Sequence, residues 1–180
     1  MRSQEIDKGL EGMVIVQDSR EQKPWVFGDR AALTVATLEA GDYSVLGMED
    51  EVAIERKSLQ DLVGTLTQGR ERFMREMHKL NGYLFAAVIV ESPISKLMKH
   101  EYISKVSPQS IIGSCIALQV RHGVAFHFCE GRAQAASLAF GFLRRYWLDT
   151  LAARSFRDAI QDAQAALGAS GIQEPGSDTP

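Results

Sequence analysis

The segment at residues 41–61 places the strongest constraint on the fold of this chain. It contains two stretches of extended character, separated by a polar, glycine-containing turn at residues 47–50. Two such stretches joined by a short turn predict a β-hairpin. A helix should begin directly after the hairpin, because Ser58 is a good N-cap residue and Asp61 stands at the capping-box position. The chain is therefore expected to pass from a strand straight into a helix.

The rest of the sequence alternates short apolar runs with amphipathic helical patterns. Helices are expected over residues 59–67, 70–80, 108–121 and 132–151, and some helix should continue to residue 167. Besides the hairpin, strands are expected over residues 13–16, 33–39, 84–90 and 124–128. Strands that come first, followed by helices alternating with strands, predict an α/β sandwich with a mixed central β-sheet.

Length and composition fit one globular domain with a substantial core, since the chain has 180 residues and is 45% hydrophobic. We expect a flexible lead-in at residues 1–12, a folded domain over residues 13–153, and a tail at residues 154–180 that is partly helical and then disordered. No apolar run reaches the length of a membrane span, about 18 residues, and no signal peptide is expected. The net charge of −3 argues against a protein that binds DNA by charge alone.

The two cysteines, Cys115 and Cys129, stand outside any C-x-x-C motif or Cys/His cluster. This pattern favours reduced thiols over a disulfide or a zinc site. The expected location is therefore the cytoplasm, at the nucleoid if the source is a bacterium or a phage.

The end of the hairpin carries residues that suit the cleavage of a phosphodiester. Side chains alternate faces along a strand, so Glu55 and Lys57 should share one face and Arg56 should take the other. The hairpin would bring Asp42 to the same end. Two carboxylates on adjacent strands can hold Mg²⁺ or Mn²⁺, and a neighbouring lysine can orient or deprotonate water, or balance charge. The pattern alone is weak, because an exposed Glu and Lys on an edge strand often have this spacing.

Further motifs surround this pattern in a fixed order. They are V-Q-D-S-R-E at 16–21, G-D-Y at 41–43, I-E-R-K at 54–57 followed by Asp61, and G-R at 69–70. Together they resemble the nuclease domain of the XPF-type structure-specific endonucleases, whose motifs read V-D-x-R-E, G-D-Y, V-E-R-K-x-x-x-D and G-R. The resemblance covers about residues 13–150. It implies a restriction-endonuclease-like three-layer sandwich, and Mg²⁺- or Mn²⁺-dependent cutting of DNA near branches or single-strand/double-strand junctions.

The resemblance also implies a role for each matching residue of the site. Asp42 and Glu55 would be the main metal ligands and Lys57 the catalytic lysine, with Asp18 beside the metal as a third acid. The remaining matches are less direct. Arg20 and Arg56 would contact phosphate or hold the acids in place, and for Arg56 a structural role is at least as expected as a contact with phosphate. Asp61 would fix the start of the helix or support Lys57.

A basic helix face begins at the G-R motif of residues 69–70. Its members are Arg70, Arg72, Arg75 and Lys79, interleaved with Glu71 and Glu76. Such a face is either a solvated helix surface or, next to an active site, a track for DNA. The resemblance assigns Arg70 a contact with the substrate backbone or with a neighbouring acid.

The resemblance also bears on partners. Longer family members add a helix-hairpin-helix module, for which residues after 151 are too few and too polar. DNA affinity would then come from the domain itself, from a homodimer, or from a helicase or DNA-binding partner in trans. The apolar stripe of Phe142, Leu143, Tyr146 and Trp147 is either core or, in part, a dimer interface.

Three functions stay open at this point. The chain is an active endonuclease, a non-catalytic DNA-binding or partner-binding module of the same fold, or an unrelated protein in which E-R-K is coincidental. Degenerate partner subunits of the family lose motif acids, whereas this chain keeps Asp18, Asp42, Glu55 and Lys57. The sequence therefore favours the active enzyme.

Overall fold

Six strands form one mixed sheet, in a computed structural model that describes residues 12–169. The expected lead-in at residues 1–11 and the expected disordered tail beyond residue 169 lie outside the described residues. The strand order is β2-β1-β3-β4-β5-β6, with β1 parallel to β2, β3 antiparallel to both β1 and β4, and β5 parallel to both β4 and β6. The strands are β1 Val14–Asp18, β2 Ala32–Ala36, β3 Tyr43–Val45, β4 Val52–Lys57, β5 Phe85–Val90 and β6 Ala125–Phe128.

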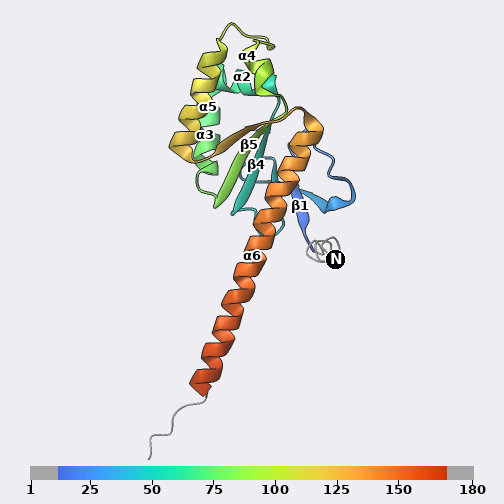
Figure 1. The fold of residues 1–180 in the computed structure, drawn as a ribbon, viewed down its shortest axis with the longest axis vertical. Helices are drawn as coiled ribbons and strands as arrows, with labels where there is room; N and C mark the ends of the chain where they lie inside the picture. The colour runs from blue at the N-terminus through green and yellow to red at the C-terminus, as the bar shows by residue number, and fades with distance from the viewer. Residues whose placement is uncertain (1–11, 170–180) are drawn as a thin grey trace, which may run out of the picture.

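Helices cover both faces of this sheet, as Figure 1 shows. Helices α2 Leu59–Thr67, α3 Arg70–Leu80 and α5 Pro108–His122 bury their apolar sides against one face, whereas α6 Arg132–Ala169 covers the other. The short helices are α4 Ile94–Met98 and the 3-10 turn Gly28–Arg30. The expected three-layer α/β sandwich with a mixed central sheet is therefore confirmed.

The predicted hairpin is formed by β3 and β4, which pair Tyr43 with Ile54. Alternation along β4 then decides which side chains reach which layer. Ile54 lies in the core beneath α6, whereas Ala53 lies in the core beneath α2, α3 and α5. Glu55 and Lys57 continue on the Ala53 side, and Arg56 continues on the α6 side, as the alternation predicted.

Helix α6 is longer than the main helical pattern at residues 132–151 indicated. It runs unbroken from Arg132 to Ala169 and projects away from the sheet (Figure 1). The side chains of residues 151–165 are exposed, so backbone hydrogen bonding rather than packing on the domain holds this part of the helix. The domain boundary predicted at residue 153 falls inside this helix and stays a prediction. No helix within residues 12–169 combines the length and the apolar character needed to cross a membrane.

Candidate active site

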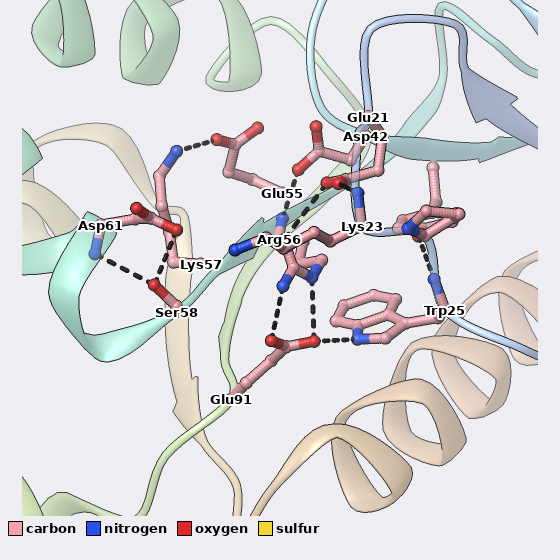
Figure 2. Close-up of polar contacts among 12 residues, drawn as sticks. Glu21, Lys23, Trp25, Asp42, Glu55, Arg56, Lys57, Ser58, Asp61 and Glu91 are labelled. Carbon is pink, nitrogen blue, oxygen red and sulfur yellow. Dashed lines mark hydrogen bonds and ion pairs between the residues drawn. The ribbon is translucent and has the colours of Figure 1, made fainter.

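Asp42, Glu55 and Lys57 line a single cleft at the end of the hairpin. The cleft has a volume of about 950 Å³ and is bordered by the segment after β1, by β4, and by helices α2 and α3. The side chains involved are drawn in Figure 2, where the lysine reaches back to Glu55 and the second carboxylate lies close by. The structure thus brings together the two acids and the lysine that the sequence singled out.

Asp42 is held by its neighbours on both the main chain and the side chain. Its N–H donates to the Ile54 carbonyl at 2.8 Å, and its Oδ2 accepts from the Arg56 N–H at 2.7 Å. Gly41 makes this close approach possible, because its φ is +74° and an added Cβ would lie 3.2 Å from the Ile54 carbonyl oxygen. The glycine of the G-D-Y motif is therefore needed where β3 begins beside β4.

Glu55 and Lys57 form a buried pair on the same side of β4. Lys57 Nζ donates to Glu55 Oε1 and lies 5.4 Å from the centre of the Phe73 ring. Burial alone would lower the pKa of Lys57, but the charge of Glu55 and the hydrogen bond to it outweigh burial and raise the pKa. The lysine is therefore a fixed cation at neutral pH.

Negative charge is concentrated around this lysine. Burial raises the pKa of Asp42 to about 8, and the charges of Glu55 and Glu21 add to the effect. Burial likewise raises the pKa of Glu55, with Lys57 opposing and Glu76 and Glu21 reinforcing the shift. Around Lys57 there are thus one buried acid, Glu55, and three half-buried acids, an arrangement that favours the binding of a further cation; the three are Asp42, Glu21 and Glu76.

The two main acids have donor atoms that suit a hard divalent cation. Asp42 uses Oδ2 and Glu55 uses Oε1 in the contacts above, and within residues 12–169 no hydrogen bond reaches Asp42 Oδ1 or Glu55 Oε2. The same residues contain no group of three or more His, Cys, Asp or Glu side chains arranged to hold a metal ion. Mg²⁺ commonly binds through one or two carboxylates plus water and phosphate oxygens, so two acids suffice for such an ion.

Asp18 lies near these acids but is engaged with Arg20. Its Oδ1 accepts from the Arg20 N–H at 2.7 Å and from Arg20 Nε at 2.8 Å, and its Oδ2 accepts from Arg20 Nη2 and from the Leu38 N–H, both at 2.8 Å. Burial would raise the pKa of Asp18, yet these hydrogen bonds outweigh it and the pKa is lowered. Asp18 borders a smaller adjoining cleft of about 420 Å³ together with Asp42 and Glu55. The hydrogen bonds to Asp18 hold Arg20, which also lines this cleft.

Arg56 points to the opposite side of β4 and binds Glu91, at the end of β5. Its Nε and Nη2 donate to the two Glu91 oxygens at 2.8 and 2.6 Å, and both side chains are buried. Trp25 Nε1 also donates to Glu91 at 2.5 Å (Figure 2), and Arg132 Nη1 donates to it at 3.2 Å. Glu91 therefore ties three separate segments together through Arg56, Trp25 and Arg132, and Arg56 both holds this junction and lines the larger cleft.

Glu91 was not identified as a site residue from the sequence, although a signal was available. It directly follows the apolar run of β5, which is parallel to β4, so the ends of the two strands must lie at the same edge of the sheet.

Asp61 fixes the start of α2, which is the first of the two roles expected for it. Ser58 Oγ donates to Asp61 Oδ2 at 2.6 Å and accepts from the Asp61 N–H at 3.1 Å. Asp61 also lines the larger cleft, so the start of α2 and Lys57 border the same site.

The four basic residues of α3 do not share one direction. Arg72 lines both clefts, and Lys79 lines the smaller one while donating to the Glu39 carbonyl at 3.2 Å. Arg70 instead donates to Ser114 on α5 at 3.4 Å, and Arg75 is exposed and lines neither of these clefts. Successive helix residues turn by about 100°, so Arg70 and Arg72 point roughly 200° apart around α3.

Two further acids reach the site, although neither was predicted as a site residue. Glu21 lines the larger cleft, and Glu76 accepts a hydrogen bond from the Gly41 N–H at 3.1 Å. Glu76 lies about one turn beyond Arg72 on α3, which places both on the cleft side. The helical spacing of these two residues was the signal that could have found Glu76.

Comparison with known proteins gives a consistent result. The family model described as the ERCC4 domain matches residues 17–142 of the chain. The solved structure of XPF from Aeropyrum pernix is similar, with 22% identity and a TM-score of 0.61 over 74% of this chain and 61% of that one. The complex of that XPF with DNA gives 23% identity and a TM-score of 0.58, over 74% of this chain and 64% of that one. At such identities the likeness shows a shared fold, and this chain spans less than two thirds of each relative. No curated protein sequence matches it.

Proposed function

Because the chain belongs to the ERCC4 domain family of XPF-type nucleases, we propose that it is a metal-dependent endonuclease that cuts branched DNA or DNA at single-strand/double-strand junctions. The observation that carries the proposal is the meeting of Asp42, Glu55 and Lys57 in one cleft. The matched region includes all three residues. A non-catalytic module of the same fold has no need of two acids in one cleft whose pKa values are raised by burial and by neighbouring carboxylates.

Mg²⁺ or Mn²⁺ would be held by Asp42 and Glu55, with Asp18 of the adjoining smaller cleft as a further acid. When bound, such an ion supplies an activated water and offsets charge on the leaving oxygen. The chain's contribution is to hold the two carboxylates rigidly, Asp42 through the Arg56 N–H and Glu55 through Lys57.

Lys57 acts as a cation in this proposal and not as a base. Its raised pKa keeps it protonated at neutral pH, so it would stabilise negative charge that develops on the scissile phosphate. Arg20 and Arg72 border the same clefts and would bind neighbouring phosphates. The DNA complex of the similar XPF supports DNA as the substrate class. A homodimer would add affinity, and sizing of the purified protein should then give about twice the mass of the 19.9 kDa chain. A helicase or DNA-binding partner in trans would add affinity in the same way.

The test is cleavage of end-labelled splayed-arm, flap and fully paired DNA by the purified protein with Mg²⁺ or Mn²⁺. Asp42→Asn, Glu55→Gln and Lys57→Ala should each lose cutting and keep a wild-type circular dichroism spectrum. Asp50→Asn is the matched control, since Asp50 is an exposed carboxylate in the turn between β3 and β4, outside both clefts.

Undiminished cutting by Glu55→Gln would refute the assignment of the site. Binding of branched DNA without cutting in either metal would favour the non-catalytic module instead.

A further inference from the structure

The connection between α4 and α5 presents an unusually exposed apolar side chain. Ile103 is 88% exposed, although it stands in the middle of an ordered loop. Exposing a large apolar side chain has a free-energy cost that a polar residue at this position would avoid. Single exposed apolar side chains are common on protein surfaces, but Ile103 differs from the others in its attachment to the cleft rim and in its basic neighbours.

This loop is built to be rigid. The His100 and Tyr102 rings stack with their centres 4.3 Å apart, His100 Nε2 lies 2.6 Å from the Ser104 carbonyl oxygen, and Tyr102 Oη donates to the Val106 carbonyl at 2.6 Å. Tyr102 and Val106 also pack on the core beneath α2, α3 and α5. These contacts hold the chain on both sides of Ile103.

The loop tip is fastened directly to the rim of the catalytic cleft. The side chain of Gln60 accepts from the Ile103 N–H at 2.9 Å and donates to the Ile103 carbonyl at 3.2 Å. Gln60 lines the larger cleft together with Lys57 and Asp61. In Figure 1 the connection between α4 and α5 accordingly lies at the end of the molecule where α2 begins.

Positive charge surrounds this apolar tip. Three lysines and one histidine are exposed on α4 and the loop, against one exposed acid, Glu101; the basic residues are Lys96, Lys99, His100 and Lys105. An apolar tip flanked by cations fits a partner that offers both phosphates and an apolar base face, and does not fit an apolar protein surface alone.

We propose that Ile103 packs as a wedge against the terminal base pair of a DNA branch point, while the phosphate next to that base pair occupies the cleft. Apolar side chains can enter between bases, but in a continuous duplex they must first unstack a base step, at a cost of a few kcal/mol. A branch point or single-strand/double-strand junction already exposes a base-pair face, so the wedge would bind there without that cost. This inference rests on the proposed function and assigns its junction preference to one residue.

The wedge can be tested by binding alone, with Ca²⁺ replacing Mg²⁺ to keep the complex uncut. A splayed-arm DNA carries 2-aminopurine, whose fluorescence rises on unstacking, at the last base pair before the branch. The wild-type protein should raise this fluorescence, and Ile103→Ala should abolish most of the rise. The ratio of affinities for splayed-arm over fully paired DNA should fall about tenfold in Ile103→Ala, the loss expected when about two of the three carbon groups removed would have been buried against the base pair.

Two variants make the result specific. Ile103→Leu keeps the apolar volume and should retain the signal and the affinity ratio. Leu84→Ala removes a similar side chain that is 78% exposed at the start of β5, the end of the sheet away from the cleft, and should behave as wild type.

A wild-type fluorescence rise and affinity ratio in Ile103→Ala would overturn the wedge, as would the absence of any rise with the wild-type protein. A lower sedimentation mass of Ile103→Asp with unchanged DNA binding would also overturn it, since the loop would then be a protein interface. Cutting without an Ile103-dependent signal refutes the wedge alone, whereas the signal without cutting in Mg²⁺ or Mn²⁺ refutes the nuclease alone.

Discussion

Replacing Asp42 with Asn should change how the stability of the metal-free protein depends on pH. Burial, together with the nearby charges of Glu55 and Glu21, raises the pKa of Asp42 from 3.8 to about 8 in the folded protein. Below the lower pKa both the folded and the unfolded chain hold the proton, so Asp42 has no effect on stability. As the pH rises between the two values, the unfolded chain loses the proton and the folded chain keeps it. Stability should therefore fall with rising pH across this window.

The size of the effect follows from one proton. The slope is at most about 1.4 kcal/mol per pH unit, so the free energy of unfolding should drop by about 3 kcal/mol between roughly pH 5 and pH 7. For a chain of this length that corresponds to roughly 6–12 °C in melting temperature. Urea unfolding in EDTA at a series of pH values measures it, and Asp42→Asn should lack this part of the slope.

A divalent cation should reverse the loss. Mg²⁺ at millimolar concentration would bind the ionised carboxylates of the folded state and raise the melting temperature of the wild-type protein above about pH 7 more than that of Asp42→Asn. Asp50→Asn, which replaces an exposed carboxylate, should behave as the wild type in both experiments. Equal pH slopes in the wild type and Asp42→Asn would refute the conclusion that burial and neighbouring acids hold Asp42 neutral.

Two other predictions concern the support of the cleft and its basic rim. Glu91→Gln leaves Arg56 buried without its carboxylate and should lower the free energy of unfolding, measured in urea, by about 3–5 kcal/mol. The control Glu101→Gln changes an exposed residue and should shift this free energy by no more than about 0.5 kcal/mol. A Glu91→Gln effect no larger than that of the control would contradict the pairing. Arg72→Ala should weaken DNA binding and reduce the slope of log affinity against log salt by about one, while Arg70→Ala, on the α5 side of the helix, should change both less. Equal losses in filter binding at several salt concentrations would show that DNA follows both sides of α3.

Local patterns in the sequence determined much of this protein. The period of two along β4 separated Glu55 and Lys57 from Arg56 before any contact was known, because alternation is a property of the strand itself. The capping pair of Ser58 and Asp61 is likewise local, and so is the turn that makes the hairpin. Four ordered motifs were enough to indicate the family, and the ERCC4 match confirms it.

Only the tertiary structure decided the relations between residues that are distant along the chain. Glu91 reaches Arg56 from 35 positions away, and Glu76 meets Gly41 across the same separation, so no local pattern could pair them. The direction of Arg72 toward the cleft and of Arg70 away from it depends on which side of α3 packs on the sheet. The raised pKa of Asp42 arises from burial and from acids on other segments. Sequence periodicity sets which face a side chain takes, whereas its surroundings, and hence its charge state, are set by the elements that fold over that face.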